Sequence, residues 1–95
     1  MANLVAAVTA NGTSTGVALT GPCTVMVSNA SVFSTAECTL QIWEDDTTGE
    51  YGSTGVTFRH GYLNPVNIEA KGSYYLRIVT ANVGATTSIT IAANQ

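Results

Sequence analysis

Few residues in this chain have side chains that could carry acid–base, nucleophilic or metal chemistry. His60 is the only histidine, and Cys23 and Cys38 are the only cysteines. A catalytic base needs a nucleophile and an orienting group within reach, but His60 precedes Gly61 and has no Ser or Cys next to it in the sequence. We interpret His60 as a turn residue and expect no catalytic residue in the chain.

Carboxylates gather at Glu44, Asp45, Asp46 and Glu50. Oxygen ligands of this kind bind calcium, but their spacing matches no standard calcium loop. Adjacent residues also point in different directions, whereas the two carboxyl groups of a glycosidase must face each other across ~5–9 Å. We predict a solvated hairpin tip here, with no bound metal and no cofactor.

The two cysteines are 15 positions apart in the sequence. A metal site would need more ligands than two Cys and one His at these distances. A disulfide would need facing positions on neighbouring strands and an oxidising compartment. We predict that Cys23 and Cys38 are buried, reduced thiols.

Aromatic side chains are the remaining candidates for a binding site, namely Trp43, Tyr51, Tyr62 and Tyr75. Such side chains can stack on sugars or anchor a protein interface, where aromatic residues are enriched. Trp43 and Tyr75 are the stronger candidates, because each lies opposite the apolar set of its strand. They form an interface if that face is open, and they are core residues if a second sheet covers it.

The positions of these residues depend on strands, because apolar residues alternate with polar ones along most of the chain. The alternation predicts strands over residues 4–10, 17–19, 23–27, 38–42, 54–59, 63–70, 73–80 and 86–92. Pro65 places the start of the strand over 63–70 at a sheet edge or at a strand end. Seven or eight short strands at this spacing indicate an all-β fold. We predict one domain over residues 1–95, an antiparallel β-sandwich wound like a jelly roll.

The same alternation divides the central strands into two faces. Cys38, Leu40 and Ile42 point inward, whereas Thr39, Gln41 and Trp43 lie on the other face. In the strand over 73–80, the inward set is Tyr74, Leu76 and Ile78, and the opposite set is Tyr75, Arg77 and Val79.

The composition excludes several classes of function. Only nine of the 95 residues are charged, against roughly a quarter in a typical soluble domain. The basic residues are Arg59, Lys71 and Arg77, too few for nucleic acid or anionic membranes. The longest apolar run, Leu4 to Val8, is far shorter than the ~20 residues of a membrane span. The first residues carry no basic group, so we expect no secretory signal.

Several short motifs follow one another along the chain. They are Gly12-Thr13-Ser14, Leu19-Thr20-Gly21, Thr24 to Val27, Thr39 to Trp43, an acidic hairpin over Asp45 to Gly49, and Gly72 to Arg77. Their order resembles that of small β-sandwich virion proteins of tailed bacteriophages. The hairpin departs from the usual Asp-Gly form. The resemblance implies a non-enzymatic virion component, such as a decoration (cement) protein, a head-fibre base or a tail accessory.

We therefore expect a capsid decoration protein that binds the major capsid protein or other virion proteins. It would be located in the virion after assembly in the host cytoplasm. We expect a homo-oligomer, and a threefold ring first, because capsid lattices present threefold sites. The alternative is a carbohydrate-binding or accessory module of a phage tail or fibre, with Trp43 and the tyrosines as its platform.

Overall fold

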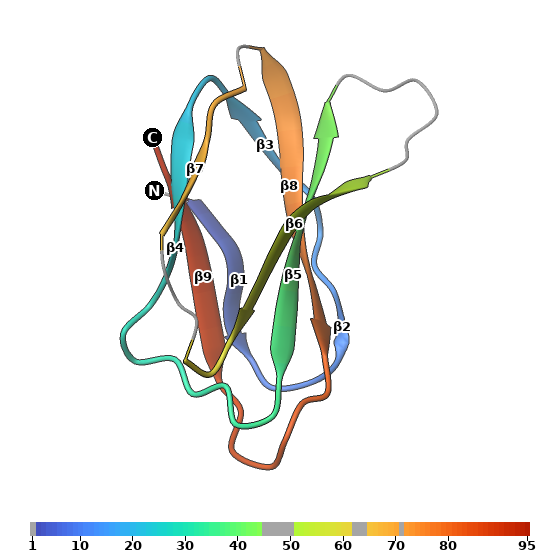
Figure 1. The fold of residues 1–95 in the computed structure, drawn as a ribbon, viewed down its shortest axis with the longest axis vertical. Helices are drawn as coiled ribbons and strands as arrows, with labels where there is room; N and C mark the ends of the chain where they lie inside the picture. Colours follow the sequence, from blue (N-terminus) through green and yellow to red (C-terminus); the bar gives the residue numbers. More distant parts are fainter. Residues whose placement is uncertain (1, 45–50, 62–64, 71) are drawn as a thin grey trace.

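A computed structural model of the chain describes residues 2–44, 51–61, 65–70 and 72–95. These residues form two antiparallel sheets packed face to face (Figure 1). The antiparallel β-sandwich predicted from the alternation is confirmed. No helix long and apolar enough to cross a membrane occurs among the described residues.

The strands of the sandwich are short. They are β1 (Ala2–Val8), β2 (Gly12–Thr13), β3 (Val17–Thr20), β4 (Cys23–Val27), β5 (Glu37–Glu44), β6 (Gly52–Arg59), β7 (Val66–Ile68), β8 (Ser73–Ala81) and β9 (Ile89–Asn94). Sheet A has the order β1-β9-β4-β7. In sheet B, β2 and β3 both pair with β8, and the order continues through β5 to β6.

The pairing shows how the chain is wound. β1 pairs with β9, β2 and β3 with β8, β4 with β7, and β5 with β6, all antiparallel. The first half of the chain thus pairs with the second half as one long ribbon. Two further pairs, β4 with β9 and β5 with β8, complete the sheets.

The core lies between the two sheets and contains the inward side chains of each strand. The most deeply buried residues are Val25, Cys38, Leu40, Phe58, Tyr74, Leu76, Ile78, Ile89 and Ile91. Removing an aliphatic or aromatic side chain of this size from water contributes ~1.5–3 kcal/mol. The inward sets predicted for β5 and β8 are therefore confirmed, although Ile42 is only half-buried.

The strand boundaries differ from the prediction at most strands: β5 and β6 are longer than predicted, and β9 begins at Ile89, three residues later. β1 starts two residues earlier than predicted, and β7 is limited to Val66–Ile68. Pro65 precedes β7, which is an edge strand as expected. β2 was not predicted, because Asn11-Gly12 is a turn signal and a strand of two residues is too short to show alternation.

Ser14 joins β2 and β3 into one edge. Its N–H donates to the Ile78 carbonyl at 2.9 Å, and its Oγ accepts the Ile78 N–H at 2.8 Å. The backbone of β8 is therefore hydrogen-bonded at Ile78 as well, between the stretch that pairs with β2 and the stretch that pairs with β3. With β2 and β3 counted as one edge strand, the described residues form eight strands, within the predicted number.

Candidate functional site

Three aromatic side chains meet on the outer face of sheet B. The rings of Trp43 and Tyr75 stack with centroids 5.0 Å apart and planes 23° apart. Tyr51 lies tilted against Trp43, with a centroid separation of 5.9 Å. Offset stacking and tilted packing are both favourable for aromatic pairs. The cluster contains three of the four aromatic candidates found in the sequence; Tyr62 lies outside the described residues.

Strand register places two polar side chains beside these rings. Trp43 is paired with Tyr75 across β5 and β8, and Gln41 is paired with Arg77 two residues further along. The Arg77 Nε donates to the Gln41 Oε1 at 2.7 Å. The guanidinium carbon of Arg77 lies 3.8 Å from the centroid of the Tyr51 ring. We call Gln41, Trp43, Tyr51, Tyr75 and Arg77 the aromatic surface.

The position of Tyr51 depends on a bulge and a glycine. Gly55 has a φ of 81°, and the pairing of β5 with β6 shifts between Thr39 and Gln41. Such a bulge bends the strand and increases its twist. The Tyr51 hydroxyl reaches the backbone of Gly16, where a Cβ would collide with it. Glycine at position 16 therefore lets the Tyr51 ring lie over Arg77.

Tyr75 is the most accessible part of the aromatic surface. It is 39% exposed, whereas the other four side chains are half-buried. Trp43 is its cross-strand neighbour on β5, and Ala18 is its neighbour on β3. Ala18 is small, so its side chain covers little of the Tyr75 ring on the β3 side. A ligand group or a partner side chain can stack there.

The chemistry of the aromatic surface is suited to binding. It offers aromatic rings, one guanidinium and one amide, and its described side chains include no nucleophile and no carboxylate. Arg59 pairs with Glu37 at 3.7 Å near the opposite end of sheet B. Within the described part of the chain, Arg77 is the one arginine without a carboxylate partner.

The structure decides between the two interpretations of Trp43 and Tyr75. Both lie on the outer face of sheet B, so they are not part of the core between the sheets. The contributions of Arg77 and Gln41 were not predicted. The alternation did place Gln41 on the face of Trp43 and Arg77 on the face of Tyr75. The register that joins these faces is not visible in the sequence.

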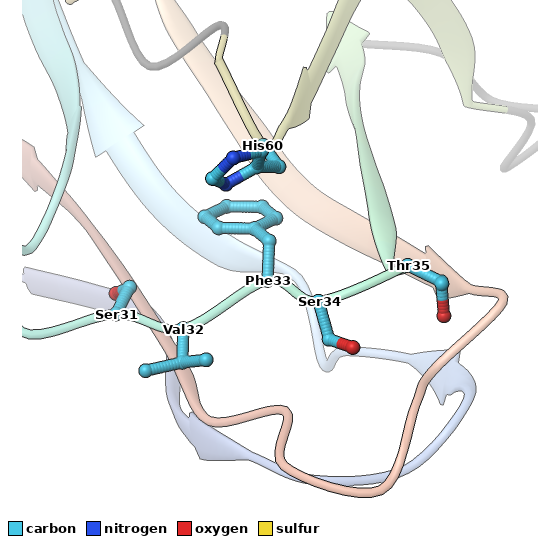
Figure 2. A pocket seen from close by; sticks show the side chains of 6 residues that line it. All are labelled: Ser31, Val32, Phe33, Ser34, Thr35 and His60. Carbon is cyan, nitrogen blue, oxygen red and sulfur yellow. The ribbon is translucent and has the colours of Figure 1, made fainter.

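His60 follows the end of β6 and lies at a turn, as predicted. It lines a hollow of about 470 Å³ together with Ser31, Val32, Phe33, Ser34 and Thr35. Hydroxyl groups far away in the sequence thus come near the only histidine. Figure 2 shows the imidazole above the Phe33 ring, with the Ser34 and Thr35 side chains pointing away from it.

Two of the hydroxyl groups that line this hollow form hydrogen bonds with backbone groups. The Thr35 Oγ1 donates to the Asn82 carbonyl at 2.7 Å, and the Ser31 Oγ accepts the Thr90 N–H at 3.0 Å. This arrangement does not pair a nucleophile with a base, which would require a direct hydrogen bond to the imidazole.

The two cysteines are buried and form no disulfide with each other; Cys23 lies in sheet A and Cys38 in sheet B. Burial raises the pKa of the Cys38 thiol, and the hydrogen bond with Thr80 opposes that rise in part. The Tyr74 hydroxyl donates to the Gly21 carbonyl at 2.6 Å and lies 3.2 Å from the Cys23 sulfur. Burial, and then this contact with Cys23, raise the pKa of Tyr74.

The predicted acidic hairpin tip lies outside the described residues, as do the side chains of Glu44, Asp45, Asp46 and Glu50. Within the described ranges, no three His, Cys, Asp or Glu residues come together as a metal ion would require. The described residues give the aromatic surface as the best candidate for a functional site.

The outer face of sheet A has a different character. Its outward side chains include Asn3, Thr24, Met26, Asn67, Thr90, Ala92 and Asn94. None of them is ionisable. All nine charged residues of the chain lie between positions 37 and 77, so β1, β4 and β9 come from two uncharged stretches of sequence.

No protein-family model matches this chain, and no curated protein and no solved structure matches it. Any functional assignment therefore rests on the residues and geometry described above.

Proposed function

We propose that this protein is a structural component of a bacteriophage particle, a capsid decoration protein that binds other virion proteins. The observation that carries this proposal is the aromatic surface on the outer face of sheet B. Trp, Tyr and Arg are the residues most enriched at interface hot spots, and here Trp43 contacts Tyr51 and Tyr75 while Arg77 contacts Tyr51. Their mutual stacking holds the rings in place before a partner arrives, which lowers the entropy lost on binding.

The winding of the chain supports a virion protein. We propose that the pairing of the first half of the chain with the second half as one ribbon, distributed over a four-stranded and a five-stranded sheet, is a jelly-roll winding. We include the jelly roll in this proposal because viral capsid domains use it. The order of the turn and strand motifs supports the assignment to tailed phages.

The contacts of the aromatic surface suggest what the partner offers. Tyr75 presents an accessible ring side, which suits an apolar or aromatic side chain. The Arg77 guanidinium lies at the margin of the same cluster, where it would pair with an acidic residue of the partner. Such a charge pair at the rim of an interface contributes orientation and association rate more than affinity.

The proposal is tested with particles assembled without this protein. Purified protein is added, the particles are sedimented, and the retained copies are counted across a range of concentrations. Tyr75→Ala removes an anchor worth at least ~2 kcal/mol if it is a hot spot, which corresponds to roughly 30-fold weaker binding. Val32→Ala is the matched control, because Val32 is the other exposed large hydrophobic residue of the described chain.

Retention of the parent and of Val32→Ala, with loss of Tyr75→Ala, supports the proposal. Absence of retention of the parent protein contradicts it. Equal retention of Tyr75→Ala and Val32→Ala contradicts the aromatic surface as the binding site.

A carbohydrate-binding function is the second candidate. The accessible side of Tyr75 beside Ala18 favours it, since sugar rings stack on such faces, and Thr20 and Ser73 add hydroxyl groups at the same edge. Lectin domains also use the jelly roll. Binding on a glycan array that Tyr75→Ala abolishes, together with absence of particle retention, would favour this function over decoration.

A further inference from the structure

β1 is an edge strand of sheet A, and its pairing with β9 is irregular. The register shifts twice, between Asn3 and Val5 and between Val5 and Val8, and each shift leaves one extra residue on β1. Ala7 lies in the second irregularity with a φ of 49°. Its N–H donates to a side-chain oxygen, the Thr90 Oγ1, at 3.0 Å. β1 is thus held to β9 by an interrupted ladder.

The local sequence does not favour a bend at Ala7. Residues 4–10 contain no Gly, Pro, Asn or Asp, and their alternation predicts a strand that continues to Ala10. The structure instead ends β1 at Val8. A left-handed φ is unfavourable for alanine, because its Cβ approaches the following carbonyl oxygen. The local preference of this segment and its place in the fold therefore conflict.

The connection that follows β1 accounts for the bend. Only residues 9–11 join Val8 in sheet A to Gly12 in sheet B. Four steps along the chain reach at most ~14 Å, and packed sheets lie ~10 Å apart. The chain must therefore turn away from β9 as β1 ends, and Ala7 lies at this turn. Short connections under strain favour exchange of the element that they hold between copies of a protein.

We propose that β1 exchanges between two copies of this chain, so that β1 of each copy pairs with β9 of the other. The structure shows what fits beside β9, because β1 lies there with Leu4 and Val5 buried. A second copy offers the same strand with the same side chains in the same order. In the exchanged pair, Ala7 takes an extended conformation and the chain runs directly from one copy to the other.

The exchange needs no large new interface. Leu4 and Val5 make the same contacts with the core in the single chain and in the pair, because β1 changes only the copy with which it pairs. Release of the left-handed Ala7 in both copies favours the pair. The entropy lost on association opposes it, so the protein concentration determines which form is populated.

The contacts of β1 with its own copy are limited. Neither β1 nor β9 contains a charged residue, so no ion pair joins them. A hollow of about 150 Å³ lies between the end of β1 and sheet B, and it is lined by Val5, Val8, Ala10, Gly12, Thr13, Ser14 and Thr80. Side chains that border such a space lack contacts on one side. The second half of β1 is therefore incompletely packed.

The exchange goes beyond the proposed function and does not rest on it. β1 belongs to sheet A (Figure 1), whereas the aromatic surface lies on the outer face of sheet B. Both copies of the pair would keep their aromatic surfaces. Each copy gives one β1 and receives one, so two copies close the assembly. The inference thus differs from the threefold ring that the capsid lattice alone led us to expect.

A disulfide between two different variants tests the exchange directly. Asn3 is paired with Ala92 across β1 and β9, and such paired Cα atoms lie ~4.5–5.5 Å apart, within the range of a disulfide. Asn3→Cys and Ala92→Cys are mixed in denaturant, refolded together at high concentration and then oxidised. We expect a disulfide that joins one chain of each variant, identified by its intact mass. Asn3→Cys mixed with Ala18→Cys, exposed on sheet B, is the matched control and should give none.

The mass of the parent protein gives a second readout. Light scattering on the eluting protein should show 9.8 kDa after refolding at low concentration and twice that mass after refolding at high concentration. The isolated pair should persist when it is diluted under native conditions, because β1 must leave its sheet before the copies can separate. This persistence distinguishes the exchange from a contact between two intact surfaces.

Ala7→Gly tests the role of the bend. Glycine adopts a left-handed φ without the cost that alanine bears, and two chains are relieved for every pair, so the association constant should fall at least ~30-fold. Ala6→Gly is the matched control, because Ala6 is the neighbouring exposed residue of β1 and its φ is not positive. It should leave the association constant within a few-fold of the parent value.

A parent that stays a single chain after refolding at high concentration overturns the inference. So does a mixture of Asn3→Cys and Ala92→Cys that forms no disulfide between the two variants. Equal association constants for Ala7→Gly and Ala6→Gly also overturn it, because the bend would then have no part in the exchange. Particle binding is scored separately with Tyr75→Ala, so failure of the exchange and failure of the decoration function are distinguishable.

Discussion

The hydroxyl of Tyr51 lies against the backbone of Gly16, at a place where no side chain could fit without moving it. This contact joins the segment before β6 to the edge of sheet B before β3. Because of it, the Tyr51 ring covers the Arg77 guanidinium and lies against Trp43. One glycine therefore determines how the aromatic surface is assembled.

Gly16→Ala should displace Tyr51 and loosen the aromatic surface. Loss of the cation–π contact and of one aromatic pair predicts a decrease of about 1–2 kcal/mol in the free energy of unfolding. Urea denaturation would measure it, and Trp43 fluorescence should change because Tyr51 leaves the indole.

The matched control is Gly12→Ala, since a Cβ at Gly12 meets nothing within 4 Å. Adding Tyr51→Phe to Gly16→Ala removes the colliding oxygen and should restore most of the lost stability. If Gly16→Ala behaves like Gly12→Ala in both stability and fluorescence, the contact with Tyr51 is unimportant.

The faces of the strands could be predicted from the sequence, and the contacts between strands could not. Alternation alone separates Leu40 from Gln41 and Leu76 from Arg77, because side chains on a strand point to opposite sides at every step. Whether Trp43 lies opposite Tyr75 or one pair further along depends on register. Register follows from turn geometry and from the whole set of buried contacts.

The rest of the candidate site depends on irregular structure, which has no periodicity. Tyr51 precedes a bulged strand, and Gly16 belongs to the gap between two short edge strands. Nothing in the sequence around Tyr51 or Gly16 indicates that these two residues are in contact. The hollow at His60 could not be predicted for the same reason, because the irregular loop between β4 and β5 brings Ser34 near His60.

Leu40 and Leu76 test the inward faces of the two central strands of sheet B. Both are fully buried. Leu40→Ala and Leu76→Ala should each lower the free energy of unfolding by ~2–5 kcal/mol, through lost burial and the cavity left behind. Thr86→Ala, at an exposed turn position, should change it by less than ~0.5 kcal/mol. A Leu40→Ala variant as stable as the parent would show that the face assigned to β5 is wrong.

Cys23 and Cys38 should both be available as thiols once the chain is unfolded. They lie in different sheets and are buried, so alkylation of the folded protein should be slow. Intact mass after alkylation in denaturant without reductant should show two added groups. A chain that gains two groups only after reduction would reveal a disulfide and contradict the assignment.

Tyr74 and Cys38 predict a loss of stability at alkaline pH. Both pKa values are raised in the folded protein, mainly by burial. The folded state therefore keeps these protons at pH values where the unfolded chain releases them, from about pH 8.5 for Cys and about pH 10 for Tyr. Their contribution is complete below those values, and it is lost as pH rises from them towards the folded pKa.

Each group should lower the free energy of unfolding by up to about 1.4 kcal/mol per pH unit in its range. Urea denaturation at pH 7, 9 and 10.5 would show the decline. Tyr74→Phe should cost ~1–2 kcal/mol at pH 7, because the Gly21 carbonyl loses its donor. It should also flatten the decline above pH 10, because the ionisable group is gone. A decline of equal slope in the parent and in Tyr74→Phe would mean that another group governs the alkaline transition.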